Sequence, residues 1–206
     1  MDVAAPYRTI GEMELEALRV LAGTTRPLTG RDVARLARSG SVSSIQRALR
    51  ALGAAGVVDV QEAGRSLLYT LNREHVATGP ALELLGLRDE LRRRMSESIA
   101  AWEIQPLHLS VFGSAARGDG DLESDIDVFC VRPAGLDEDD PRWREQLDTL
   151  ARHVRRWSGN PLALSEVSEA ELRRLRREQP PVVASLRADA VTLAGTDAAE
   201  LLRGRR

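Results

Sequence analysis

The stretch Gly113-Ser-Ala-Ala-Arg-Gly118, followed by Ser124-Asp-Ile-Asp-Val128, places a glycine turn beside two alternating carboxylates. The apolar, β-rich run Leu107–Phe112 predicts a short buried strand that stops at this turn. Because Gly113 has no side chain, the backbone can come close to a ligand there, and Ser114 adds a hydroxyl donor. The residues after the turn can open a helix whose free N–H groups point at anionic oxygen. The stretch therefore predicts a phosphate cradle.

A second apolar run, Ile126–Val131, predicts the next strand. Side chains two residues apart on a strand share a face, so we expect Asp125 and Asp127 to point together. Two such carboxylates repel each other unless a cation lies between them, and Mg²⁺ or Mn²⁺ accepts oxygen ligands completed by substrate phosphates. The pair predicts a metal clamp for transfer from a nucleoside triphosphate. The competing interpretation is an acidic, solvated strand end.

The spacing of these residues resembles a known signature. Gly113-Ser114, ten intervening residues and Asp125-Ile-Asp127 resemble the motif of the DNA polymerase beta-like nucleotidyltransferase superfamily, and the fuller pattern resembles its minimal branch. The resemblance covers roughly residues 107–195. It implies a small mixed-sheet domain and transfer of a nucleoside monophosphate (NMP) from a nucleoside triphosphate (NTP).

The same resemblance implies roles for six residues of the motif: triphosphate binding by Gly113 and Ser114, Mg²⁺ binding by Asp125 and Asp127, and nucleotide binding by Arg117 and Ser124. An alternative for Arg117 is a simple ion pair with Asp119, Asp121 or Glu123, of small energetic value.

The third acid expected of such a site has one candidate in this sequence. Family members carry it on a later strand, and the run Leu162–Val167 makes Glu166 the best candidate for a metal ligand or for the group that receives the acceptor proton. Its alternative is a solvated residue that caps the following turn. Nearby, Cys130 lies on the apolar strand and is expected to be a buried small hydrophobe rather than a nucleophile.

Bulk composition limits the classes of protein. The chain has 206 residues, enough for two modest domains, and a net charge of −2. Its single Cys excludes an internal disulfide framework, and no apolar run approaches the length of a bilayer-spanning helix or a signal-peptide core. We expect a cytoplasmic, soluble protein. All basic residues are Arg, so phosphate contacts must come from guanidinium groups or backbone amides.

The N-terminal part has a different pattern, of three short helices followed by two strands around a glycine turn. The helices are expected at Glu12–Leu21, at Arg31–Arg38 and after a cap at Ser43 or Ser44, and the strands at Val57–Val60 and Leu67–Leu71. This order predicts a winged helix-turn-helix and resembles the MarR- and ArsR-like regulators. The resemblance implies a third helix that reads DNA and a wing that contacts phosphate, through Ser43, Gln46, Arg47, Arg50 and Arg65. Residues 1–75 carry ten Arg and eight acids, so a dimerisation or protein-docking module is the alternative.

Between these parts, Ala81–Ala101 has helical spacing and predicts a connecting helix within residues 76–106. Exposed Leu positions on it would find a partner in a second copy of the chain, so a homodimer is expected. Later patterns predict a helix over Trp143–Trp157 and a strand at Val191–Leu193.

The sequence thus predicts a two-domain α/β (α+β) protein, with a winged helix-turn-helix at 1–75 and a nucleotidyltransferase domain at 107–206. The expected activity is Mg²⁺-dependent transfer of an NMP to a protein side chain, a small molecule or an RNA end. The resemblance to antitoxin transferases that modify HEPN toxins implies a toxin as one such protein. The alternative is a DNA-binding regulator or antitoxin whose second domain senses nucleotide or partner without turnover.

Overall fold

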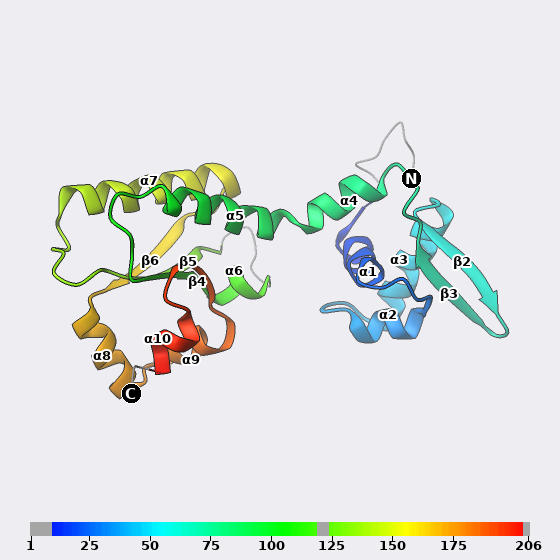
Figure 1. Cartoon of the computed structure of the whole chain (residues 1–206). Coiled ribbons are helices and arrows are strands. Elements are labelled where there is room, and N and C mark those ends of the chain that lie inside the picture. The colour runs from blue at the N-terminus through cyan, green and yellow to red at the C-terminus, as the bar shows by residue number, and fades with distance from the viewer. Residues whose placement is uncertain (1–9, 119–123, 204–206) are drawn as a thin grey trace. The chain divides into compact units, whose positions relative to one another are not determined.

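The computed structural model describes residues 10–118 and 124–203 (Figure 1). The chain folds into two compact units, Met1–Leu87 and Arg88–Arg206. Each unit has its own hydrophobic core. Within the described ranges, no helix is both long enough and apolar enough to cross a bilayer.

In the part of the chain that the structure describes, the first unit has four helices and a three-stranded antiparallel sheet with the order β1-β3-β2. In chain order the elements are α1 (Glu12–Ala22), β1 (Leu28–Thr29), α2 (Gly30–Leu36), α3 (Val42–Ala54), β2 (Val58–Ala63), β3 (Ser66–Leu71) and α4 (Thr78–Leu85).

Two helices of this unit, α2 and α3, begin where a side chain accepts a hydrogen bond from one of their first N–H groups. Thr29 and Asp32 form a capping box at the start of α2. At the start of α3 the cap is Ser41, whose side chain accepts a hydrogen bond from the Ser44 amide. The expected cap at Ser43 or Ser44 was therefore wrong by two or three residues. Of Ser41, Ser43 and Ser44, it is Ser41 that has the extended backbone of a helix cap.

The apolar faces of α1, α3 and β3 form the core of the first unit. Leu18, Ile45 and Leu49 are fully buried in it. The predicted hairpin is confirmed, since β2 and β3 pair from Val58↔Leu71 to Ala63↔Ser66, with the two-residue loop Gly64-Arg65 at the tip (Figure 1). The burial pattern leaves the outward face of α3 and the tip of the hairpin exposed.

Residues 76–106 do not form the single connecting helix that the sequence predicts. They contain α4 and α5 (Leu87–Ala100), separated at Gly86, whose amide donates to the Leu82 and Glu83 carbonyls and ends α4. Ala81 of α4 belongs to the core of the first unit, whereas Met95 and Ile99 of α5 are buried in the second. The two helices therefore pack into different cores, while Leu84 and Leu87 between them are exposed.

The second unit is built on a mixed four-stranded sheet with the order β6-β5-β4-β7, as expected for its fold class. β4 pairs antiparallel with β5 and β7, and β5 pairs parallel with β6. After α5 the elements are β4 (His108–Val111), α6 (Gly113–Arg117), β5 (Ile126–Val131), α7 (Pro141–Ser158), β6 (Leu162–Val167), α8 (Glu169–Glu178), α9 (Pro181–Asp189), β7 (Val191–Gly195) and α10 (Ala198–Arg203).

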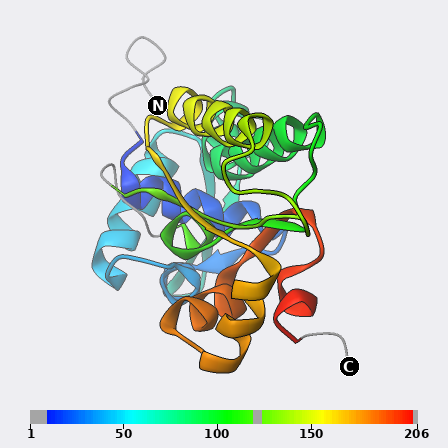
Figure 2. The same cartoon turned by 90° about the vertical axis from the view of Figure 1, so that its left-hand side faces the viewer.

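Helices cover both faces of this sheet (Figures 1 and 2). On one face α5 and α7 pack through Met95, Ile99 and Trp143 against Val128 and Cys130. On the other face α8, α9 and α10 pack against Phe129 and Val131. Because neighbouring residues of β5 point to opposite faces, its even-numbered side chains face α7 and its odd-numbered side chains face α9. All three Trp residues lie in this unit, at positions 102, 143 and 157.

Candidate functional site

The turn between β4 and α6 is shaped around the carboxylate of Asp127. Gly113 has a φ of +67°, and a Cβ placed on it would lie 2.6 Å from Asp127 Oδ2. The Phe112 amide donates to the Asp127 carbonyl at 3.1 Å, so the turn is tied to β5 at this point. Both the backbone angle and the close contact favour glycine at position 113 over any residue with a side chain.

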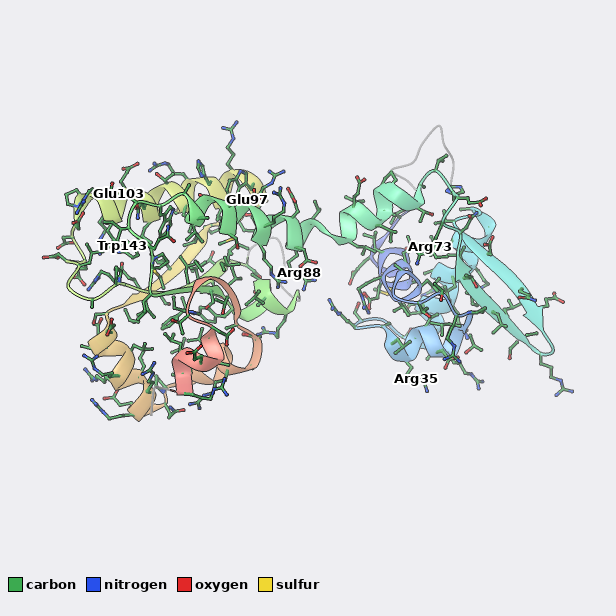
Figure 3. All side chains as sticks on the ribbon, viewed as in Figure 1. Arg35, Arg73, Arg88, Glu97, Glu103 and Trp143 are labelled. Atoms are coloured by element: carbon green, nitrogen blue, oxygen red, sulfur yellow. The ribbon has the colours of Figure 1, made fainter. Side chains whose placement is uncertain are left out.

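The short helix α6 is held from its C-terminal side by two arginines of α5. Arg88, labelled in Figure 3, donates from Nη1 to the Arg117 carbonyl at 3.0 Å. Arg92 Nη2 donates to the Ala116 carbonyl at 2.7 Å. Gly118, in the left-handed region at φ +82°, ends the helix, and a side chain there would occupy the space of the Arg88 guanidinium. These contacts satisfy carbonyls that a helix end otherwise leaves open.

The two acids of the motif differ in exposure. Asp127 is half-buried within β5, whereas Asp125 is exposed and lies just before the strand. Burial raises the pKa of the Asp127 carboxyl, and the negative charge of Asp125 raises it further, while Arg117 opposes the shift. A divalent cation beside these oxygens would relieve this destabilisation of the charged form.

The structure adds an acid that the sequence did not indicate. Asp189, the last residue of α9, accepts a hydrogen bond from the Gly113 amide at 3.1 Å and forms an ion pair with Arg117 Nη1 at 2.5 Å. Its side chain is 9% exposed, and its charge contributes to the raised pKa of Asp127. The contact joins positions far apart in the chain, so no local motif signals it. The only hint in the sequence is an acid two residues before the apolar strand that begins at Val191.

Glu166 does not belong to this site, and the prediction that it completes the metal site was wrong. In the β5–β6 register Glu166 pairs with Cys130, whose side chain faces α7, whereas Asp127 points to the other face. The Glu166 carboxylate accepts hydrogen bonds from Arg132 at 2.6 Å, Trp143 Nε1 at 2.9 Å and Arg144 at 3.1 Å. It is the centre of a partly buried ion-pair network between β5, β6 and α7.

The remaining motif residues frame the same turn. The Ser114 carbonyl, in the half-buried helix α6, accepts a hydrogen bond from the Gly118 amide at 2.7 Å, and the Ser124 carbonyl accepts one from Asn160 Nδ2 at 2.9 Å. The acids proposed as alternative partners of Arg117, at positions 119, 121 and 123, lie outside the described residues. Cys130 is fully buried, and burial raises the pKa of its thiol to about 12, which fits a structural residue.

The donor set around Asp127 fits a divalent cation held jointly with a substrate. Among the described residues, no group of three or more His, Cys, Asp or Glu side chains is arranged to hold a metal ion. Mg²⁺ commonly takes only one or two protein carboxylates and completes its shell with water and substrate phosphates. Asp125 and Asp127, next to a turn in which a side chain at position 113 would be strained, meet that description.

The first unit contains a second polar feature, which we call the arginine groove. Its volume is about 650 Å³, and its lining residues come from the start of α2, from α3 and from the hairpin: Thr29, Gly30, Arg31, Gln46, Arg50, Arg65, Ser66, Leu67 and Tyr69. The lining contains three arginines and no acid. None of these three arginines forms an ion pair with another residue in the described ranges.

The structure thus brings together three of the five residues predicted to contact DNA, namely Gln46, Arg50 and Arg65. Ser43 and Arg47 are exposed on α3 outside the groove. Arg31 was not anticipated, because its position one residue into α2 gives no signal in the sequence.

Residues 89–188 match the nucleotidyltransferase domain family. The matched region spans just under half of the chain and runs from α5 to α9, so it contains the Gly113 turn and both acids of the motif. Asp189 lies one position beyond its end.

No curated protein matches the chain. Among solved structures, a crystal structure of a toxin–antitoxin with AMP-PNP aligns at 16% identity, over 54% of this chain and 81% of that chain, with a TM-score of 0.37. A similarity at this level carries no argument about the fold or the function of this chain.

Proposed function

We propose that the second unit transfers an NMP from an NTP to an acceptor, with Mg²⁺ or Mn²⁺ bound by Asp125 and Asp127. The observation that carries the proposal is the contact at the Gly113 turn, where a Cβ would lie 2.6 Å from Asp127 Oδ2. A turn of this kind places a backbone amide and a candidate metal ligand side by side, as binding of a metal–triphosphate complex requires. The family match over residues 89–188 supports the class of chemistry.

Each residue of the motif has a role that follows from its chemistry. Gly113 N–H and the Ser114 hydroxyl would donate to oxygens of the β and γ phosphates, and Arg117 would neutralise part of their charge. Ser124 would support the nucleotide from the segment that leads into Asp125. When bound, the divalent ion would stabilise the attacking and leaving oxygens of an in-line displacement.

Three acceptor classes fit this reaction: a protein side chain such as one on a toxin, a small molecule and an RNA end. Incubating the full chain with α-labelled NTPs, Mg²⁺ and cell lysate separates them, because label moves to the protein, small-molecule or RNA fraction. Asp127→Ala should abolish the transfer. Asp148→Asn is the matched control, since Asp148 is an exposed carboxylate on α7, which covers the sheet face opposite to Asp127. Absence of transfer by the wild type in all fractions would contradict the enzymatic proposal.

A second function is favoured by the register of β6. The residue of β6 that pairs with Asp127 is Ala163, so the neighbouring strand contributes no carboxylate beside it. Asp125 and Asp127 are able to bind a metal–nucleotide complex, whereas turnover also needs a group to receive the acceptor proton, which β6 does not supply. The alternative is therefore a regulator or antitoxin that senses nucleotide or partner. Calorimetric binding of Mg–NTP without label transfer would support the sensor.

For the first unit we propose a winged helix-turn-helix that binds DNA, with α3 as the reading helix and the β2–β3 hairpin as the wing. The support is the arginine groove, in which Arg31, Arg50 and Arg65 gather without a neutralising acid. A local concentration of unpaired guanidinium groups provides the phosphate attraction that the small net charge of residues 1–75 does not suggest. Footprinting of the full chain on the DNA upstream of its own coding sequence tests the proposal. The proposal would be contradicted if the protein protected no sequence in this DNA and also failed to bind random-sequence duplex DNA at low salt.

A homodimer is also proposed, because Leu84 and Leu87 are 52% and 59% exposed. A two-fold dimer would suit a palindromic DNA site. Sedimentation of the wild type against a Leu84→Glu, Leu87→Glu variant tests it, since only the wild type should sediment as a dimer.

A further inference from the structure

The Asp189 carboxylate occupies donors that the proposed nucleotide would need. Its Oδ1 accepts the hydrogen bond of the Gly113 amide at 3.1 Å, and its Oδ2 lies 2.5 Å from Arg117 Nη1. One carboxylate therefore bridges the turn and the guanidinium, in the same way as two oxygens of a phosphate would. With a side chain only 9% exposed, Asp189 is an internal anion of the site.

The two anions cannot share these donors. A backbone amide has a single hydrogen, so Gly113 N–H can serve either Asp189 or a phosphate oxygen. Arg117 has further donors, but a phosphate drawn to it would approach a buried carboxylate of the same charge. Binding of a triphosphate at the turn therefore requires Asp189 to release the Gly113 amide.

The position of Asp189 is electrostatically unfavourable apart from these two contacts. It is the last residue of α9, where the helix dipole disfavours a negative charge. It also lies close enough to Asp127 to raise the pKa of that carboxyl. An uncharged residue would avoid both penalties, so the charge itself calls for an explanation beyond packing.

We propose that Asp189 is a displaceable latch, which holds the Gly113 turn and Arg117 in the absence of nucleotide and competes with the triphosphate for them. This inference rests on the proposed function, since it concerns the same site. It adds Asp189, which lies outside the family match, to the site. It also predicts a lower affinity for nucleotide than the site would have if its donors were unoccupied. With such a latch, the apparent affinity for nucleotide equals the intrinsic affinity multiplied by the fraction of molecules in which the latch is open.

The test uses inorganic tripolyphosphate in metal-free buffer, because this anion carries the phosphate tail without the base, the sugar or the metal. Calorimetry with the full chain compares the wild type, Asp189→Asn and the control Asp148→Asn, which removes the same charge from an exposed position on α7. Asp189→Asn should bind tripolyphosphate about tenfold more tightly than the wild type, which corresponds to about 1.4 kcal/mol. Asp148→Asn should bind as the wild type does.

The same proteins are then titrated with Mg–NTP, so that failure of the latch and failure of the proposed function can be distinguished. Tighter binding of tripolyphosphate by Asp189→Asn, with no Mg–NTP binding by any protein, would support the latch and reject the nucleotidyltransferase. Mg–NTP binding by the wild type, with tripolyphosphate bound equally or more weakly by Asp189→Asn, would reject the latch and retain the proposed function. No binding of tripolyphosphate to either protein also overturns the latch.

If Asp189→Asn fails to fold, NMR of the wild type gives the answer. Addition of tripolyphosphate should shift the Gly113 amide and the Asp189 carboxyl carbon together, at the same half-saturating concentration. Perturbation of the Gly113 amide without any change at Asp189 would overturn the proposal.

Discussion

The arginines at the two candidate sites, one in each unit, are in opposite electrostatic situations. In the first unit Arg31, Arg50 and Arg65 line a groove whose lining has no acid, whereas in the second unit Arg117 is paired with Asp189 and Arg132 with Glu166. The same guanidinium group is therefore free to meet an external polyanion in one unit and is engaged by internal acids in the other. The comparison teaches that the small net charge of the chain describes neither unit, because pairing decides what an arginine can bind.

The largest effect is expected when the buried ion pair between Arg132 and Glu166 in the second unit is removed. Glu166→Ala leaves Arg132, whose side chain is 10% exposed, without its closest acid and also removes the acceptor of Trp143. We expect the free energy of unfolding to fall by ~3–5 kcal/mol, as for other broken buried pairs. Urea unfolding followed by circular dichroism measures it. Glu178→Ala is the control, because it removes an exposed partner of Arg174 and should cost at most ~1 kcal/mol. Similar losses for both variants would mean that the Glu166 network is no stronger than a surface pair.

The next test separates function from stability at the nucleotide site. Asp127→Asn should lower label transfer more than ~100-fold, since loss of a direct metal ligand should exceed the effect of changing its supporting partners. The metal-free protein should nevertheless become more stable at neutral pH. The reason is that burial and Asp125 raise the pKa of Asp127, so its ionised form is disfavoured in the folded state. Thermal unfolding in metal-free buffer checks the sign, and a lower Tm in the variant would show that the carboxylate stabilises the turn.

A third test measures how much the arginines of the groove in the first unit contribute to DNA binding. Arg50→Ala and Arg65→Ala should each weaken binding to a random-sequence duplex several-fold, and each should lower the slope of log affinity against log salt by about 0.9. Arg35→Ala should leave both quantities unchanged, because Arg35 is paired with Asp32 on the surface of α2 (Figure 3). Fluorescence anisotropy at several salt concentrations gives the slopes. Equal effects of Arg35→Ala and Arg50→Ala would mean that the groove is not the contact surface.

The smallest expected effect concerns pH and is confined to the second unit. Burial lowers the pKa of His108, whose Nδ1 lies 2.7 Å from the Thr196 carbonyl oxygen and whose Nε2 lies 2.9 Å from Ser110 Oγ. Below pH 6.5, the ordinary pKa of histidine, His108 therefore takes up a proton in the unfolded chain but resists protonation in the folded chain. Stability should fall as the pH drops from about 6.5 towards the folded-state pKa, by at most about 1.4 kcal/mol per pH unit.

His108→Gln should flatten this slope, as measured by urea unfolding at several pH values. Asp127 acts in the opposite direction, because its raised pKa favours proton uptake by the folded state. Stability that rises with falling pH in the wild type would show that Asp127 outweighs His108.

Local patterns predicted much of the fold. The strands Ile126–Val131 and Leu162–Val167 were predicted at their observed bounds, because apolar runs between turn residues depend little on distant contacts. The hairpin around Gly64-Arg65 was predicted for the same reason. The range 76–106 differed, since its Leu residues fit one long helix in sequence, and only packing reveals that α4 and α5 serve different cores.

The contacts of the candidate site between residues close in sequence could be predicted, whereas those that depend on the pairing register of β5 and β6 could not. Gly113 and Asp127 are close in sequence and meet in space, whereas the face occupied by Glu166 is fixed by its pairing with Cys130 across two strands. A shift of one residue in that register would have placed the carboxylate on the other side of the sheet. Asp189 reaches the site from the end of α9, a contact between distant segments for which no spacing rule exists.

The confinement of all three tryptophans to the second unit has a practical consequence. Both tyrosines of the chain, at positions 7 and 69, belong to the first unit. Light that excites only indole therefore reports melting around Trp143, while the far-ultraviolet signal follows the helices of both halves. One unlabelled sample thus reveals, from a mismatch between the two optical transitions, whether the halves lose their structure in a single cooperative event or one after the other.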